Sequence, residues 1–120
     1  MPKKVAIIDD NKEFVELCTD ALEREGYEVL PSIGSLRAYE IVKQGNPDLI
    51  MLDIMMPGRS GWELLDILKM DPETRNIPIL ITTGVRAATA RLAGTMYEVL
   101  KKPFELDDLL AKVAKLIGKP

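Results

Sequence analysis

Acidic side chains follow two short apolar segments of this chain. Residues 5–8 are followed by Asp9 and Asp10, and residues 49–52 are followed by Asp53. Continuous apolar runs of this length are typical of strands that are buried on both faces of a parallel sheet. The carboxyl ends of such strands open onto the crevice where α/β proteins bind ligands. Three carboxylates gathered there would repel one another unless a cation joined them, so we predict a divalent-metal site beside a reactive carboxylate.

A hydroxyl and an ammonium group stand at the ends of two later apolar segments. Residues 79–81 lead into Thr82 and Thr83, and a short run that ends at residue 100 leads into Lys102, directly before Pro103. In a parallel sheet these groups would lie at the same edge as the acids. Each signal is weak by itself, whereas their combination at successive strand ends is specific.

The elements that must position these groups alternate along the chain. Strands alternating with helices favour a parallel α/β sheet with right-handed crossovers. The predicted strands are 4–8, 27–31, 48–52, 78–82 and 97–100, and the predicted helices are 12–25, 36–44, 61–70 and 105–117.

Local signals set the expected ends and faces of these elements. Pro31 marks the end of the second strand, because proline cannot continue a ladder. Ser35 is expected to cap the second helix and Gly45 to end it. On the first helix, Phe14 and Leu17 belong to the predicted apolar face.

Composition narrows the class of protein. The 120 residues predict one domain over residues 1–120, with a net charge of −3 and no basic stripe for nucleic acid. No signal peptide and no apolar run of about 18 residues is present, so we expect a soluble, cytoplasmic chain without membrane contact. Histidine is absent, which excludes histidine zinc sites, Ser-His triads and a phosphohistidine formed on this chain. The single Cys18 is expected to be a packing residue.

With these residues in place, the sequence closely resembles the receiver domain of two-component response regulators. The resemblance spans the whole chain and includes the pattern Asp-x-x-x-Pro-x-x-x-Gly at Asp53, Pro57 and Gly61, and the Lys-Pro-Phe segment that begins at Lys102. It implies a flavodoxin-like fold, a doubly wound five-stranded parallel sheet in the order 2-1-3-4-5. In that order strands one and three are neighbours, which would bring the acids together.

The resemblance also implies roles for the acids. Asp9 and Asp10 would hold Mg²⁺, with Mn²⁺ as a substitute. Asp53 would accept a phosphoryl group and also bind the metal, and Met55 would lend its backbone carbonyl. Oxygen ligands of this kind are those that Mg²⁺ prefers.

Two further groups would act on the phosphoryl oxygens. Lys102 would supply a flexible point charge, and Thr83 a hydrogen bond. Thr83 is chosen over Thr82 because it lies five residues after Pro78, directly before a small residue. The donor would be a histidine kinase or a histidine-containing phosphotransfer protein, and output would run through an unidentified downstream protein. The chain would be a signalling module rather than an enzyme, and a monomer or weak homodimer.

The sequence departs from the family pattern at the switch aromatic and in the segment before it. Val99 stands where the family has its switch aromatic. Tyr97 lies two residues earlier and would point the same way across a regular strand, so either Tyr97 substitutes for that aromatic or, as we expect, the aromatic relay is absent. The segment 85–95 is short and has few large apolar residues, which predicts a short, displaced or mobile fourth helix. Met55 and Val85 are apolar where family members control the hydrolytic water, which predicts slow autodephosphorylation.

Three other functions compete with this interpretation. A pseudo-receiver that binds partners without phosphorylation fits the shortened segment but not the intact acids, hydroxyl and lysine. A phosphohydrolase of the haloacid-dehalogenase type would need an Asp-x-Asp pattern on strand one, where Asp9 and Asp10 have no spacer. Flavin binding would need a phosphate-binding loop after strand one, where the acids stand.

Overall fold

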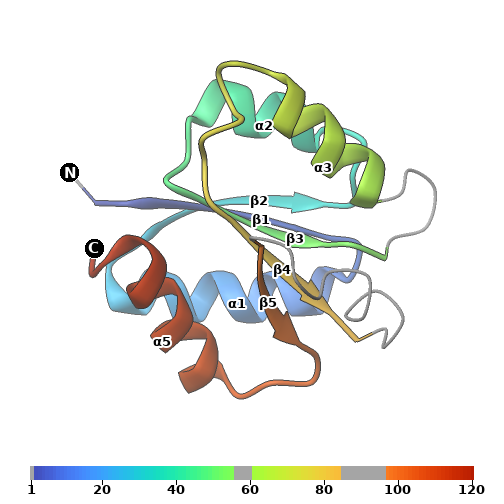
Figure 1. Ribbon diagram of the computed structural model, residues 1–120. Helices are drawn as coiled ribbons and strands as arrows, with labels where there is room; N and C mark the ends of the chain where they lie inside the picture. The colour runs from blue at the N-terminus through green and yellow to red at the C-terminus, as the bar shows by residue number, and fades with distance from the viewer. Residues whose placement is uncertain (1, 56–60, 85–96) are drawn as a thin grey trace.

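Five parallel strands form the centre of the molecule, and helices cover both of its faces (Figure 1). The computed structural model describes residues 2–55, 61–84 and 97–120. Its elements are β1 (Lys4–Asp9), α1 (Lys12–Glu25), β2 (Glu28–Ile33), α2 (Ala38–Gly45), β3 (Leu49–Asp53), α3 (Gly61–Met70), β4 (Ile79–Thr83), β5 (Glu98–Lys101) and α5 (Leu106–Ile117). The strand order is β2-β1-β3-β4-β5, which confirms the predicted flavodoxin-like sheet.

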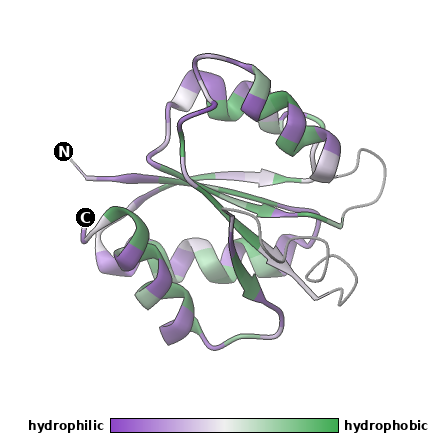
Figure 2. Cartoon of the chain, viewed as in Figure 1, coloured by the Kyte–Doolittle hydropathy of each residue, from purple (hydrophilic) through white to green (hydrophobic). Residues whose placement is uncertain are grey.

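The sheet separates two aliphatic cores. Alternate residues of a strand point to opposite faces, so in β1 Ala6 and Ile8 pack on the side of α2 and α3, while Val5 and Ile7 pack on the side of α1 and α5. Figure 2 shows hydrophobic and hydrophilic residues on both α3 and α5, as expected for helices with one side against a sheet. This burial on two faces explains why β1 is apolar from Val5 to Ile8 and β3 from Leu49 to Leu52.

Strand β2 continues past the proline that was expected to end it. Pro31 pairs with Ile7 inside the strand, which runs on to Ile33. Because β2 is an edge strand, it needs to donate hydrogen bonds on one side only, and proline is tolerated there. Buried and exposed residues are mixed along β2, as expected for a strand at the edge of a sheet.

Helix α2 begins and ends differently from its prediction. Its N-cap is Arg37 rather than Ser35, and no side chain caps it; the Ser35 carbonyl instead accepts a hydrogen bond from the Ala38 amide. At the other end Asn46, not Gly45, has the left-handed conformation, with φ of 48°. Asparagine tolerates that conformation, so position 46 does not require glycine.

Helix α1 has the predicted bounds but a slightly rotated buried face. Val15, Cys18 and Leu22 are buried, which confirms that Cys18 is a packing residue. Leu17 is 54% exposed, contrary to the prediction. The apolar stripe is centred on the three buried residues, and Leu17 lies beyond its edge.

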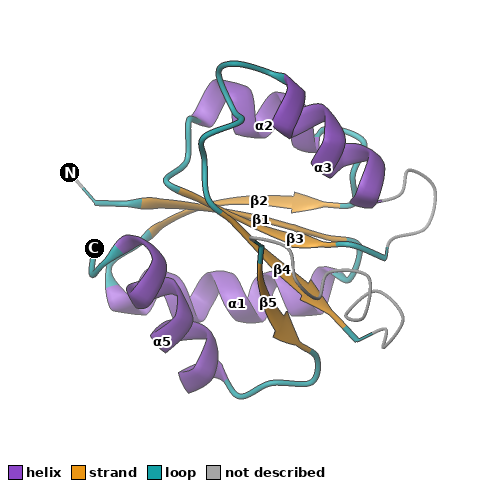
Figure 3. Cartoon of the chain, viewed as in Figure 1, coloured by secondary structure: helices purple, strands orange, loops and turns teal. Residues whose placement is uncertain are grey.

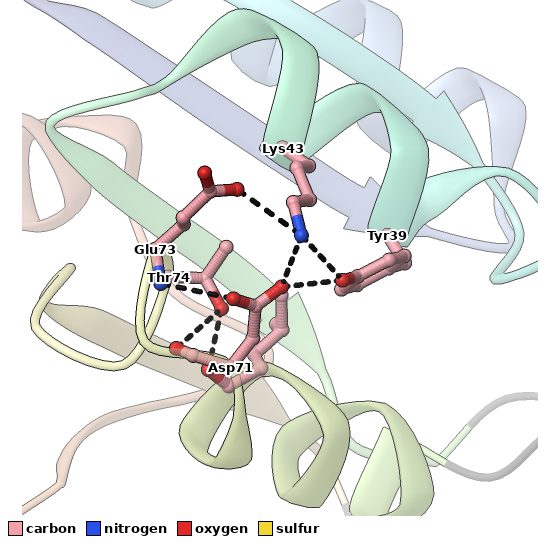
Figure 4. A network of polar contacts seen from close by, with 6 residues as sticks. Tyr39, Lys43, Asp71, Glu73 and Thr74 are labelled. Carbon is pink, nitrogen blue, oxygen red and sulfur yellow. Dashed lines mark hydrogen bonds and ion pairs between the residues drawn. The ribbon is translucent and has the colours of Figure 1, made fainter.

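A cluster of polar side chains joins α2 to the turn that follows α3 (Figure 4). Lys43 Nζ lies 2.8 Å from Asp71 Oδ2 and 3.1 Å from Glu73 Oε2. The Tyr39 hydroxyl donates to the same Asp71 carboxylate. The hydrogen bond from Lys43 is the main cause that lowers the pKa of Asp71 to about 2. The cluster therefore fixes the C-terminal end of α3, whose N-terminal end lies near the acidic residues.

Two sequence predictions fall outside the described residues. The expected short or mobile fourth helix lies within residues 85–96, and Pro57 and Val85 are also among the residues that are not described. Among the helices that are described, none is long and apolar enough to cross a membrane.

Candidate functional site

The ends of β1 and β3 bring the three predicted acids together. The two strands are neighbours, with Ile8 opposite Leu52, so Asp9, Asp10 and Asp53 follow at the same edge of the sheet. One carboxylate oxygen from each acid lies within 4.8 Å of the others. Figure 3 shows the loops that follow these strands on the same side of the molecule. Asp9 and Asp53 are buried, whereas Asp10 is exposed.

Backbone amides orient the two buried carboxylates. The Asn11 amide donates to Asp9 Oδ1 at 2.9 Å, and the Met55 amide donates to Asp53 Oδ1 at 3.1 Å. In each case the amide two residues later in the chain closes a tight local turn on the acid. The second oxygen of each carboxylate is therefore left to face the other groups of the site.

Lys102 brings an ammonium group to these second oxygens. Its Nζ lies 2.6 Å from Asp9 Oδ2 and 3.6 Å from Asp53 Oδ2. The Lys102 backbone amide also donates to the carbonyl of Thr83 at 2.8 Å, which joins the ends of β4 and β5. The ammonium therefore offsets part of the charge of the acids, and it lies closer to Asp9 than to Asp53.

The surroundings of Asp53 disfavour its ionised form. Burial raises the pKa of this carboxyl, Lys102 lowers it, and the neighbouring charge of Asp9 raises it further. A cation bound among the three acids would relieve this repulsion. Three converging carboxylates, one of them exposed, are the hard oxygen ligands that suit Mg²⁺ or Mn²⁺, so the donor set fits the predicted metal.

The remaining predicted site residues lie at the same edge. Thr83 is fully buried at the end of β4, and Thr82, opposite Asp53 in the sheet, is buried as well. Met55 follows β3 and its side chain is 48% exposed. The hydrogen bond from Thr83 to a phosphoryl group and the metal contact of the Met55 carbonyl stay predictions.

The two candidate switch positions lie on one side of β5. Tyr97 and Val99 are both partly buried against the core beneath α2 and α3, as their spacing in a strand predicted. Trp62, at the start of α3, is partly buried against the same core. The expected absence of the aromatic relay stays a prediction.

The sequence interpretation missed the position of Phe14. It assigned this residue to the apolar face of α1, but the Lys102 ammonium lies 4.1 Å from the centre of the Phe14 ring. The Phe104 ring packs edge-on against Phe14, with ring centres 5.8 Å apart and planes at 81°. The sequence signal for this contact was the presence of an aromatic residue in the first helical turn after Asp9 and Asp10.

Comparisons with known proteins agree with this arrangement. A family model described as the response regulator receiver domain matches residues 5–114. The polar-differentiation response regulator DivK of Brucella anthropi is 40% identical, with 98% of each chain covered. The DNA-binding dual master transcriptional regulator RpaA of Synechocystis is 32% identical over 99% of this chain, which spans only 50% of that relative.

Solved structures extend the likeness to three dimensions. The receiver domain of the Francisella response regulator 1452 has a TM-score of 0.83 at 27% identity and 96% coverage of both chains. The chemotaxis protein CheY4 of Vibrio cholerae has a TM-score of 0.86 at 24% identity, covering 97% of this chain and 99% of that one, and it supports the fold. Because the family model matches most of the chain and DivK is similar over its whole length, this chain belongs to the response regulator receiver domain family.

Proposed function

We propose that this chain is a phosphoacceptor receiver that takes a phosphoryl group on Asp53 and signals by binding another protein. The observation that carries the proposal is the position of Asp53, whose carboxylate is held beside two further acids and the ammonium of Lys102. Phosphoryl transfer asks mainly for positioning and for neutralisation of charge, and this site offers both.

The contacts of Asp53 support Oδ2 as the attacking atom. Its Oδ1 accepts a hydrogen bond from Met55, which leaves Oδ2 to attack phosphorus while the bond between the phosphoryl group and its donor breaks. The product is an acyl phosphate on Oδ2, the oxygen that lies 3.6 Å from Lys102 Nζ. The ammonium is thus close enough to donate to a phosphoryl oxygen, and the Thr83 hydroxyl would donate to another.

A divalent cation belongs to the same proposal. Asp9, Asp10 and Asp53 would hold Mg²⁺ or Mn²⁺, together with the Met55 backbone carbonyl. When bound, the metal supplies charge neutralisation at the phosphoryl oxygens.

We propose that the phosphoryl donor is a histidine of another protein. The chain contains no histidine, so a phosphohistidine of a histidine kinase or of a phosphotransfer protein would provide the group. We further propose that output runs through a separate partner protein. On this proposal the chain is a signalling module that catalyses only its own phosphorylation and a slow autodephosphorylation, which the apolar Met55 beside the acceptor favours.

Labelling with acetyl phosphate tests the proposal. The wild-type chain should gain one phosphoryl group by mass spectrometry when Mg²⁺ is present and none in EDTA. Asp53→Ala should abolish the gain, while Asp20→Asn, an exposed acid on α1 paired with Arg24, should leave it unchanged. Label that persists in Asp53→Ala would refute Asp53 as the acceptor. A folded wild-type chain without label would favour the pseudo-receiver.

A further inference from the structure

The Lys102 ammonium lies between the acids and an aromatic ring. On one side it is 2.6 Å from Asp9 Oδ2 and 3.6 Å from Asp53 Oδ2. On the other side it is 4.1 Å from the centre of the Phe14 ring, well inside the distance at which a ring attracts a cation. The ring therefore occupies a side of the ammonium that water would otherwise solvate.

The Phe14 ring is itself held in place from two directions. Phe104, from the segment between β5 and α5, packs edge-on against it, an arrangement that aromatic pairs favour. At the start of α1, Asn11 Oδ1 accepts a hydrogen bond from the Phe14 amide at 3.0 Å. The Asn11 amide also donates to Asp9. Asn11 therefore contacts both Asp9 and the backbone of Phe14, and it holds these two neighbours of Lys102 at a fixed distance from each other.

A lysine side chain needs such support at this position. Its stem has four flexible carbons, and the Lys102 side chain is 24% exposed. A cavity of about 470 Å³ adjoins it, lined among the described residues by Phe14, Leu17 and Phe104 as well as Lys102 itself. Without the ring, the ammonium would have room to turn away from the acids.

We propose that Phe14 is a positioning residue for Lys102. Its ring holds the ammonium beside Asp9 and Asp53, where the ammonium can donate a hydrogen bond to a phosphoryl group on Asp53. The effect on phosphorylation rests on the proposed function, whereas the contact itself is a property of the unphosphorylated chain. The two parts can therefore be tested separately.

Proton NMR of the unphosphorylated chain tests the contact. Protons of the Lys102 stem beside the ring should be shifted upfield by its ring current, and they are identified as the signals lost in Lys102→Arg. Phe14→Leu should abolish the shift and Phe14→Tyr should keep it. A shift that survives in Phe14→Leu, or that is absent from the wild-type chain, would overturn the proposal.

The rate of labelling by acetyl phosphate in saturating Mg²⁺ tests the role. Phe14→Leu should label about fivefold more slowly, the size expected when a partly exposed cation–π contact is lost. Phe14→Tyr, which keeps the ring, should restore most of the rate. Leu17→Ala removes an apolar side chain that lines the same cavity from α1, and should match the wild-type rate.

The outcomes separate the two proposals. A wild-type chain with the Lys102 shift but without label would refute the proposed function and leave the positioning contact standing. Equal rates in Phe14→Leu and the wild-type chain, or an equal loss in Phe14→Tyr, would overturn the role of the ring. If Phe14→Leu does not fold, Phe14→Met, which keeps the apolar volume without the ring, takes its place in both measurements.

Discussion

Asp53 stands in surroundings that favour its neutral form. It is 6% exposed, it lies beside Asp9, and the nearest ammonium is closer to Asp9 than to Asp53. Burial, the largest cause, raises its pKa above 3.8. The folded chain therefore binds this proton more tightly than the unfolded chain, so the stability of the fold falls as the pH rises through 3.8 and beyond. At neutral pH the ionised Asp53 lowers the stability of the fold, and the proposed reaction requires this ionised form.

Asp53→Asn should remove this cost. We expect its free energy of unfolding at pH 7 without metal to exceed that of the wild-type chain by about 1 kcal/mol, a size common when a functional residue is replaced. The gain should disappear below pH 3.8, where the acid is protonated in both states. Urea unfolding in EDTA over a pH series measures it, with the exposed Asp20→Asn as the control. A less stable Asp53→Asn at pH 7 would contradict the expectation.

At the scale of elements, the sequence predicted best where burial is complete. The apolar runs of β1 and β3 and the periodicity of α1 and α3 define their positions closely, because both faces of an inner strand and one face of a helix must be covered. The misjudged details depend on neighbours in space. Pro31 is acceptable only because β2 is an edge strand, and Leu17 is exposed because the buried stripe of α1 is centred on Val15, Cys18 and Leu22.

The same distinction holds within the site. The meeting of Asp9 and Asp53 follows from the adjacency of β1 and β3, so the strand order was enough to predict it. The preference of Lys102 for Asp9, and its contact with Phe14, depend on how far a side chain that follows β5 reaches toward β1 and α1. No pattern in the sequence indicates that distance, so these two contacts could not be predicted.

The first residue of α3, Gly61, packs against the backbone of the site. A Cβ on Gly61 would lie 2.5 Å from Ile54 Cα and 2.6 Å from the Asp53 carbonyl oxygen, and such backbone atoms cannot move aside cheaply. The Gly61 amide also donates to the Ile54 carbonyl at 3.1 Å. The start of α3 therefore packs directly on the backbone that presents the acceptor carboxylate.

Gly61→Ala should disturb both the fold and the site. We expect a loss of about 1–3 kcal/mol in the free energy of unfolding, as for an overpacked core, together with slower labelling by acetyl phosphate. Urea unfolding and mass spectrometry measure the two effects. Gly84→Ala is the matched control for stability, because its Cβ would lie at an ordinary 3.6 Å from Lys102 Cβ. Wild-type stability in Gly61→Ala would disprove the close packing.

At the scale of the whole molecule, hydrogen bonds hold the chain termini at the end of the sheet opposite the acids. Figure 1 shows both termini at the end of the sheet away from the strand ends that carry the acids. There the Tyr27 hydroxyl donates to the Gly118 carbonyl at 2.8 Å, and Lys3 donates to the carbonyl of Ile117. These contacts hold α5 against the sheet. The repulsion among the acids therefore arises in a fold whose opposite end is held by hydrogen bonds.

Such a scaffold should gain stability as a unit when a cation binds. A metal that binds the folded chain and not the unfolded one raises the free energy of unfolding by about 2.7 kcal/mol at a hundred times its dissociation constant. We therefore expect the melting temperature to rise with Mg²⁺ and to fall back in EDTA, as followed by circular dichroism. Sodium chloride of equal ionic strength, which only screens the acids, should reproduce little of the rise.

Asp10→Asn separates metal binding from general screening in this measurement. Asp10 is exposed, so its replacement should leave the metal-free chain nearly as stable as before. The variant loses one of the three converging carboxylates, so most of the rise with Mg²⁺ should disappear. A full rise in Asp10→Asn would place the cation elsewhere on the molecule, and would remove the metal from the site around Asp53.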